Sequence, residues 1–412
     1  MRSRCWWILL AGSHGTNQAR RYYAVLERPT SDNNRQDAVE YFTVGHDCAT
    51  SQFDAALCDS STQDAISIFF AGIGDARHFY ATIADIAHHE RNSKKMPKRK
   101  YHFTVLDLKA PAIARDLIIL YLLIKLSKIQ DKALPEWTDI LTAVYFIFAT
   151  PIVPGHVYET LRGTVQEIIS DISDPGKLPG WLYLYEPDKE AVVNTLRSWE
   201  TETLKRFDTR LIRQLAVSHN VKTSMRLSAM GGQSLVPPGC EKERARFLET
   251  GMLEPAPEFL KRHDEELQKL LGETSKKSKT KMGKYLDMNW KTNVTVIDLE
   301  WEDNKWTSEP PDMGFHPFDV AGQLIEETGI KPKNPKRLFD YTTEFFIRAA
   351  RALGQLEGQL TIEVVMGELL ETLEKIRFGL LDRRSDTLHG EKNSESDLFP
   401  LCYDRIHMSN IP

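Results

Sequence analysis

The sequence predicts an α/β fold whose functional site is divided between two distant parts of the chain. Residues 65–71 form a short buried-strand pattern that ends in the turn Gly72-Ile-Gly-Asp75. The last eleven residues, Cys402–Pro412, have the pattern of another strand running into a loop. Ligands of open parallel sheets bind beyond the carboxyl ends of the strands, so both segments are candidates for one site. Because the chain stops directly after this strand, we expect the sheet to lack its final strands.

The bulk composition is that of a folded protein with two lobes. The 412 residues are 41% hydrophobic and 27% charged. The formal net charge of -5 gives no reason to expect nucleic-acid binding. The five cysteines lie far apart without a C-x-x-C pair, which argues against an obvious zinc module and favours a reducing, cytoplasmic location. The apolar run at 117–124 is too short to span a bilayer, so we expect no membrane association.

Residues 64–150 alternate between strand and helix patterns, as a βαβ unit does. Asp75 is placed to cap the helix that follows the first strand. The apolar residues of that helix recur at helical spacing: Phe79, Ile83 and Ile86. Residues 92–100 are basic and predict an exposed loop, and residues 101–107 predict the second strand.

The next helix should begin near Pro111, which suits a first turn, and should run through Lys125. It is apolar nearly all round, which indicates that it lies against the sheet. Residues 134–290 are mostly helical in pattern. Within this segment, the lysine-rich residues 272–284 predict a surface loop.

Two later segments complete the prediction. Residues 294–301 have strand character. Residues 341–381 predict one long amphipathic helical region, broken at Gly354 or Gly367.

The glycine turn is the best candidate for a ligand site. A tight strand-to-helix turn directs backbone N–H groups at a phosphate, carboxylate or ribose, and Gly72 and Gly74 have no Cβ to obstruct the approach. The dinucleotide fingerprint fails, because Arg77 stands where it requires a third glycine. The methyltransferase-type loop is a closer match in Gly72–Ala76, although Phe70 replaces its usual acidic residue. The alternative is a plain tight turn.

Four further residues are candidates for the same site. Asp107 ends the second strand, where an acid can accept hydrogen bonds from ribose hydroxyls. It lies 33 residues after Gly74, against a usual spacing of about 20, and the basic loop can absorb the difference. Alternatively, Asp107 caps the following turn. Ser409 and Asn410, with Asp404, can line the same crevice if the last strand lies beside the first, or they can simply form a turn.

Charged residues near the glycine turn have two interpretations. Arg77 and His78 oppose the helix dipole, so they either hold an anionic group or pair with a carboxylate such as Asp75, which is the commoner outcome. We predict no metal site, because adjacent histidines in His88-His89-Glu90 point in different directions and no third ligand has matching spacing.

At these residues the chain resembles the domain of unknown function 4470 family. This domain occurs at the N-terminus of dynein axonemal assembly factor 3 and in many fungal proteins, some with a MYND zinc finger. The resemblance covers roughly 41–150 and 290–412. The matching segments are Tyr41–His46, Phe69–Thr82, Phe103–Leu108, Ile113–Asp116 and Tyr403–Pro412.

The resemblance implies a methyltransferase-like Rossmann sheet, incomplete at the C-terminus, with a large helical insertion and no established reaction. The best-named relatives act in cytoplasmic assembly of dynein arms. This chain lacks the MYND cysteine pattern and stops where relatives continue. The implied division of the chain is 1–40, an N-terminal extension; 41–150, the first part of the Rossmann-like domain; 151–290, the helical insertion; and 291–412, the rest of the domain with a long helix and the final strand.

Two functional hypotheses follow. The first is a non-catalytic assembly or interaction protein with protein partners, which predicts an apolar contact patch on the insertion. The second is an S-adenosylmethionine-dependent methyltransferase or a binder of that ligand, which predicts a crevice at Gly72–Asp75 bounded by Asp107. We favour the first, because the acidic residue is missing at position 70, no catalytic motif is present and the helical insertion is long. The fold alone does not decide between them, since one scaffold supports many functions.

Overall fold

The computed structural model describes residues 43–45, 47–55, 65–92, 99–174, 176–229, 236–273, 276–304, 316–326, 328–329, 332, 335–378, 380–381 and 399–409. The predicted extension 1–40 and the candidate residue Asn410 lie outside these ranges.

The strands are β1 (Ala65–Ala71), β2 (Lys100–Asp107), β3 (Ile152–Pro154), β4 (Leu182–Leu184), β5 (Trp290–Thr292), β6 (Leu360–Met366) and β7 (Arg405–Met408). The helices are α3 (Arg77–Asn92), α4 (Ala110–Lys128), α5 (Pro135–Ala149), α6 (Gly155–Ser173), α7 (Lys189–Thr201), α8 (Thr203–Arg206), α9 (Thr209–Ala229), α10 (Glu241–Thr250), α11 (Pro257–His263), α12 (Glu265–Gly272), α13 (Lys276–Asn289), α14 (Leu299–Asn304), α15 (Pro317–Glu326), α16 (Leu338–Gln355) and α17 (Leu369–Arg377). Two 3-10 turns are η1 (Glu186–Asp188) and η2 (Val294–Val296).

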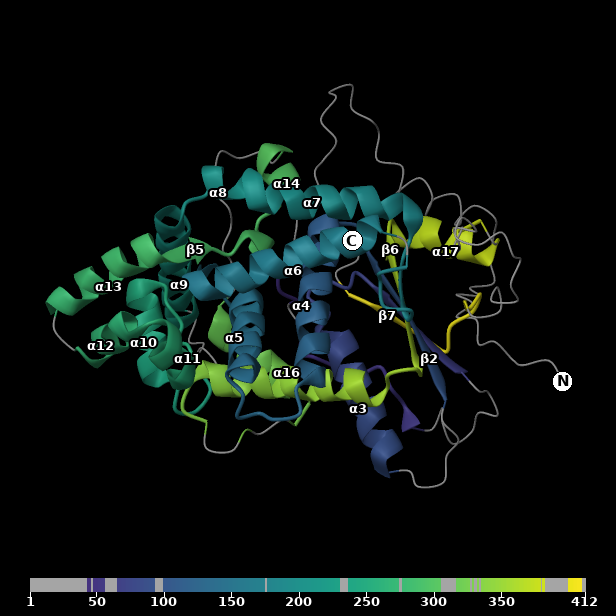
Figure 1. Cartoon of the computed structure of the whole chain (residues 1–412), viewed down its shortest axis with the longest axis horizontal. Helices are drawn as coiled ribbons and strands as arrows, with labels where there is room; N and C mark the ends of the chain where they lie inside the picture. Colours follow the sequence, from purple (N-terminus) through teal and green to yellow (C-terminus); the bar gives the residue numbers. More distant parts are fainter. Residues whose placement is uncertain are drawn as a thin grey trace.

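A parallel sheet joins the two ends of the described chain. Its strand order is β4-β6-β2-β1-β7, and each neighbouring pair is parallel. Strands β1 and β2 have the predicted positions, and β7 lies beside β1 although more than three hundred residues separate them (Figure 1). The last strand thus lies beside the first, which is the condition under which Ser409 can reach the same crevice. A second, two-stranded antiparallel sheet pairs β3 with β5.

Helices cover one face of the parallel sheet, and a helical body extends away from it (Figure 1). Helix α16 packs against both α3 and α4. Pro111 lies in the first turn of α4, as predicted. The apolar residues Ile113, Leu117 and Leu120 of α4 face the sheet, while α5, α6 and α7 contact its other sides. A helix that is apolar all round is buried all round, which explains its sequence.

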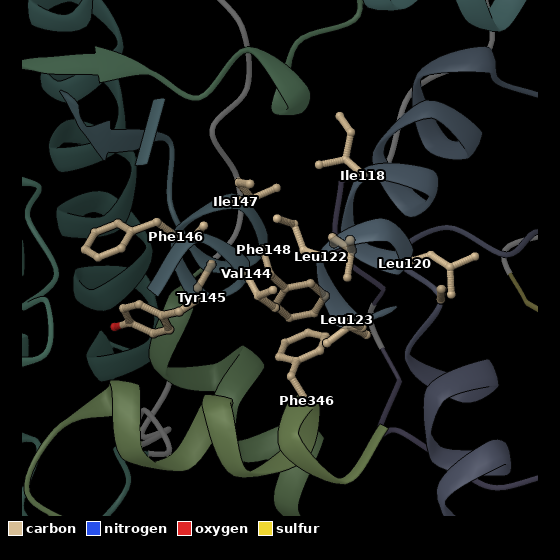
Figure 2. Packing of buried hydrophobic residues seen from close by; sticks show 14 of the residues in the cluster. Ile118, Leu120, Leu122, Leu123, Val144, Tyr145, Phe146, Ile147, Phe148 and Phe346 are labelled. Carbon is tan, nitrogen blue, oxygen red and sulfur yellow. The ribbon is translucent and has the colours of Figure 1, made fainter. Parts of the chain in front are cut away.

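The centre of the helical layer is built from aromatic and branched side chains. Figure 2 shows Phe148 of α5 against Phe346 of α16, with Leu122 and Leu123 of α4 beside them. The two phenyl rings are 4.9 Å apart and nearly perpendicular, an arrangement that favours aromatic pairs. Burying each of these side chains contributes roughly 1.5–3 kcal/mol, so this cluster anchors the helices to one another.

The opposite face of the sheet has a smaller cover. Phe69 and Ala71 of β1 and Leu106 of β2 pack against α17, which lies on the far side of the sheet from the helical body (Figure 1). Tyr403, just before β7, places its ring 5.0 Å from that of Phe69. Within the described residues, no helix combines the length and apolar character that crossing a membrane requires.

Two predictions, at 272–284 and at 294–301, are wrong. The lysine-rich segment 272–284 is not a loop, because α13 begins at Lys276 and buries Met282 and Leu286 four residues apart. Lysine is a good helix former, so two apolar anchors are enough to place this segment in a helix. The predicted strand at 294–301 is instead η2 followed by α14.

The residues of η2 are all buried, and they do not pair in a sheet. Asn293 precedes them, and its side-chain amide donates to the carbonyl oxygen of Thr150 at 2.7 Å. Its side-chain oxygen accepts a hydrogen bond from the Thr295 hydroxyl at 2.8 Å. A buried asparagine that satisfies the backbone of a turn explains why strand-like residues form a 3-10 turn.

The prediction of one long helical region at 341–381 is only partly right. Helix α16 ends just after Gly354, but the chain then forms strand β6 and returns to helix at α17. Gly358, with a φ of 81°, lies in the turn that joins α16 to β6. The strand contains β-branched residues that are buried on both faces of the sheet, a preference that amphipathic spacing alone does not reveal.

Candidate functional site

The described candidate residues meet at the carboxyl edge of the parallel sheet. The glycine turn follows β1, Asp107 ends β2, and Ser409 follows β7. Ala71 is level with Leu106 on one side and with Met408 on the other, so the three strand ends are aligned. The backbone N–H of Ser409 donates to the carbonyl oxygen of Ala71 at 3.0 Å. The structure thus brings Gly72, Gly74, Asp75, Asp107 and Ser409 together.

The glycine turn has an unusual backbone. Gly72, Gly74 and Ala76 have φ values of 66°, 58° and 55°, all in the left-handed region. The two glycines adopt this region without steric cost, whereas the Cβ of Ala76 is strained there. Because Ile73 donates its backbone N–H to the carbonyl oxygen of Leu106 at 3.0 Å, the turn is attached to β2.

Asp107 holds this turn with its side chain. Its Oδ2 accepts a hydrogen bond from the backbone N–H of Gly74 at 3.0 Å, and its Oδ1 accepts one from Lys109 at 3.0 Å. Burial raises the pKa of Asp107, and the hydrogen bonds from Lys109 and Gly74 partly oppose that rise. The backbone of the chain itself therefore binds both carboxylate oxygens. Through its bond to Lys109, Asp107 caps the turn that follows it, which is the alternative role considered for this residue.

Asp75 and Arg77 form a buried ion pair beside the turn. Nη2 of Arg77 lies 2.5 Å from Oδ2 of Asp75, and both side chains are shielded from solvent. Burial opposes the charge of Asp75, but Arg77 and the N–H of Gly45 outweigh it and lower the pKa of Asp75. Nη1 of Arg77 also donates to the carbonyl oxygen of Asp47 at 2.7 Å and to Oε1 of Gln323 at 2.8 Å. Arg77 thus pairs with a carboxylate and joins three segments.

Two histidines, His78 and His407, lie next to this ion pair. The sequence analysis considered His78, which follows Arg77, but did not single out His407. The rings of His78 on α3 and His407 on β7 are 4.2 Å apart. Nδ1 of His78 accepts a hydrogen bond from the N–H of Thr50 at 3.1 Å. Burial and the neighbouring His78 lower the pKa of His407 to about 4. His407 lies on β7 beside Phe70 of β1. In the sequence, only its place within the predicted last strand could have indicated this position.

Asp404 does not belong to this site, so that hypothesis is wrong. It precedes β7, and the first residue of β7 is level with Ile68, so Asp404 lies toward the opposite edge of the sheet. Its Oδ2 accepts hydrogen bonds from the N–H of Ser67 at 2.8 Å and from the Ser67 hydroxyl at 3.1 Å. The strand is only four residues long, but that is enough to separate Asp404 from Ser409.

A small cavity lies under the glycine turn, between the sheet and helices α3 and α4. Its volume is about 30 Å³, which suits a water molecule and is far too small for a nucleoside. Among its lining residues are Ile73 and Ala76 of the turn, and Asp116 contributes a carboxyl group. Neither carboxylate oxygen of Asp116 has a hydrogen-bond partner in the described part of the chain. Burial raises the pKa of the Asp116 carboxyl group well above its usual value.

Comparison with known proteins identifies one domain. Residues 43–148 match the family described as Domain of unknown function (DUF4470). This match confirms the first block of the resemblance, which contains the glycine turn and Asp107; it does not extend to the second block, which contains β7. Neither the curated proteins nor the solved structures contain a match to the chain. Residues 43–148 therefore form a domain that matches the DUF4470 family, whose description names no activity.

Proposed function

We propose that this protein is a non-catalytic assembly or interaction protein that acts in the cytoplasm through protein partners. The observation that carries the proposal is the engagement of Asp107. Its two carboxylate oxygens accept hydrogen bonds from Gly74 and Lys109 of the chain itself. A ribose hydroxyl would have to share these oxygens with the backbone of the turn, which weakens what Asp107 offers to a ligand. Asp75, the other acid at this edge, is likewise paired with Arg77.

We further propose that the scaffold is a methyltransferase-like Rossmann sheet with a helical insertion at 151–290. In chain order, β1, β2, β6 and β7 occupy the sheet as 3-2-1-4, which is the order of the first four strands of the Rossmann sheet. Strand β4, contributed by the insertion, extends the sheet beyond β6. A shared scaffold supports a binding role as readily as a catalytic one.

We place the partner-binding surface at strand β7 and helix α17. Exposed large apolar side chains on the helical insertion are Leu211, Met225 and Met288. More of them lie near the end of the chain: Leu370, Phe378, Leu380, Leu401, Ile406 and Met408. Ile406 and Met408, 47% and 63% exposed, stand on the edge strand of the described sheet. An edge strand with apolar side chains suits a partner that adds an extended apolar segment.

The first test is calorimetric titration of the untagged chain with S-adenosylmethionine and with S-adenosylhomocysteine. We expect no binding heat from the folded chain. Asp107→Asn tests the site, and Asp264→Asn is the matched control, because Asp264 also accepts a backbone N–H but caps α12 in the helical body. Micromolar binding that Asp107→Asn removes and Asp264→Asn preserves would overturn the proposal in favour of a methyltransferase or a binder of that ligand.

The second test concerns the surface. A photo-crosslinking residue at position 406 should capture a partner from cell extract, and the capture should disappear when Met408→Lys is added. Met288→Lys is the matched control, because Met288 is exposed on α13. Capture that Met288→Lys removes while Met408→Lys leaves it intact would move the partner surface to the insertion.

A further inference from the structure

A cluster of two histidines and one aspartate lies in the helical body, away from the carboxyl edge of the sheet. Asp139 is on α5, His156 is in the first turn of α6, and His263 is the last residue of α11. One donor atom from each residue lies within 4.8 Å of the others. Their side chains are 20%, 44% and 21% exposed, so an ion from solvent can reach them.

We propose that Asp139, His156 and His263 form a binding site for a divalent transition-metal ion of the zinc type. Two neutral imidazoles and one carboxylate are the ligand set that zinc accepts when three protein groups hold it. The exposure of the cluster leaves a fourth position for water. Imidazole nitrogens select against magnesium and calcium, which prefer an all-oxygen set.

The distances between donor atoms are close to those that zinc requires. Nε2 of His263 is 3.0 Å from Oδ1 of Asp139, and Nε2 of His156 is 4.0 Å from Oδ2 of the same carboxylate. In a tetrahedral zinc site with bonds of about 2.0–2.1 Å, two donor atoms lie roughly 3.3 Å apart. The first distance is shorter than this spacing and the second is longer, so His156 has to approach the carboxylate.

Metal binding requires one defined rearrangement. The imidazoles of His156 and His263 are stacked, with centroids 3.7 Å apart and planes 15° from parallel. Lone pairs of parallel rings do not converge on one point, so one ring has to rotate. His156 is the more exposed of the two, whereas the ring of Phe259 lies 4.8 Å from that of His263 and restricts it. The rotation therefore belongs to His156.

Arg262 supports the carboxylate without occupying both of its oxygens. Its Nη2 donates to Oδ1 of Asp139 at 2.5 Å and to the carbonyl oxygen of Pro135 at 3.1 Å. The carboxylate is thereby oriented, and Oδ2 faces His156 and is available to the ion. Hydrogen bonds of this kind to metal-bound carboxylates are a regular part of metal sites. Bound metal would also link α11 to the α5–α6 pair.

The experiment is calorimetric titration of the untagged full chain with zinc chloride, repeated with cobalt(II) while its visible absorption is recorded. We expect one ion per chain, with micromolar or tighter affinity, and an absorption spectrum of tetrahedral cobalt. His156→Ala and His263→Ala should each weaken binding at least about tenfold. His88→Ala is the matched control, because His88 is exposed on α3 and belongs to the only histidine pair adjacent in sequence.

Circular dichroism and thermal melting establish that each variant is folded. We expect both histidine variants to fold, because the two side chains are partly exposed. Absence of zinc binding by the folded chain would overturn the proposal. Unchanged affinity in His156→Ala and His263→Ala would overturn it equally, as would loss of binding in His88→Ala alone.

Discussion

At the level of single residues, the carboxyl edge of the sheet depends on the charge balance between Asp75 and Arg77. Both side chains are buried, and each is the main partner of the other. Removing one member of a buried pair leaves an unpaired charge, so we expect Arg77→Leu to lower the free energy of unfolding by about 3–5 kcal/mol at pH 7. Urea denaturation measures this quantity.

The control for this substitution is Arg206→Leu. Arg206 pairs with Asp303 at 2.7 Å, but both side chains are substantially exposed, so the loss should be below about 1 kcal/mol. Equal losses in the two variants would contradict the structural role of the buried pair. Because the pKa of Asp75 is lowered in the folded state, its contribution in the natural protein is present above its ordinary pKa and is lost as the pH falls below it.

His407 makes a second residue-scale prediction, on pH dependence. Folding keeps His407 neutral down to pH about 4, whereas the unfolded chain binds its proton near pH 6.5. Stability should therefore fall as the pH decreases from about 6.5 to about 4. The full shift corresponds to roughly 3 kcal/mol, and partial exposure reduces the expected loss to about 1–2 kcal/mol.

Unfolding free energies at pH 7 and pH 4.5 test this prediction. The His407→Gln variant should lose less stability between these two values than the natural chain does. His88→Gln, at an exposed position, should behave as the natural chain. If His407→Gln shows the same pH dependence as the natural chain, then His407 is protonated in the folded state as easily as in the unfolded state.

At the level of elements, the glycine turn determines how β1 is joined to α3. Gly74→Ala places a Cβ on a residue with a φ of 58°, which costs about 1–2 kcal/mol although the nearest atom, the carbonyl oxygen of Gly72, is 3.9 Å away. Gly163→Ala is the matched control, because Gly163 is exposed within α6 and has open space around it. There alanine should stabilise the chain by about 0.5–1 kcal/mol.

Chemical denaturation of both variants measures the two effects. Gly74→Ala should lower the free energy of unfolding, whereas Gly163→Ala should raise it. This difference in sign shows that the backbone conformation at Gly74, and not the added methyl group itself, causes the loss. A Gly74→Ala variant as stable as the natural chain would show that the turn can adopt another conformation.

Elements whose patterns depend on neighbours in the sequence were predictable, and those that depend on distant contacts were not. The positions of β1 and β2 followed from apolar runs ended by Gly72 and Asp107. The strand β6 was read as helix, because its β-branched residues gain their preference from β2 and β4 on either side. The helix α13 was read as a loop, because its anchors pack against other helices.

The same division applies to the candidate site. The alignment of the glycine turn, Asp107 and Ser409 followed from the rule that parallel strands end at one edge. The assignment of Asp404 to that edge was wrong, because the bounds of a four-residue strand are too fine for a sequence pattern. The cluster at Asp139 and His263 could not be predicted, since its members come from three helices without regular spacing.

At the level of the whole molecule, stability should be greatest in the centre of the sheet. Strands β1 and β2 each have a paired neighbour on both sides, whereas β4 and β7 are at the edges of the described sheet. We expect backbone amides of β1 and β2 to exchange with solvent only on global unfolding, and those of β4 and β7 to exchange faster through local opening. Hydrogen exchange followed by mass spectrometry measures both, with the buried helix α5 as the internal reference. Equal protection of β7 and β1 would contradict this gradient.

The pairing of β1 with β7 has a consequence for how the protein is made. Ile68 lies opposite Arg405, so one side of β1 has no partner until the ribosome has added more than three hundred further residues. At about 5–20 residues per second, this delay lasts roughly 20–70 s. Strand β2 can pair with β1 early, and the helical body can form meanwhile. During that interval the nascent chain presents an apolar strand with free backbone donors and acceptors, which is the kind of segment that chaperones bind.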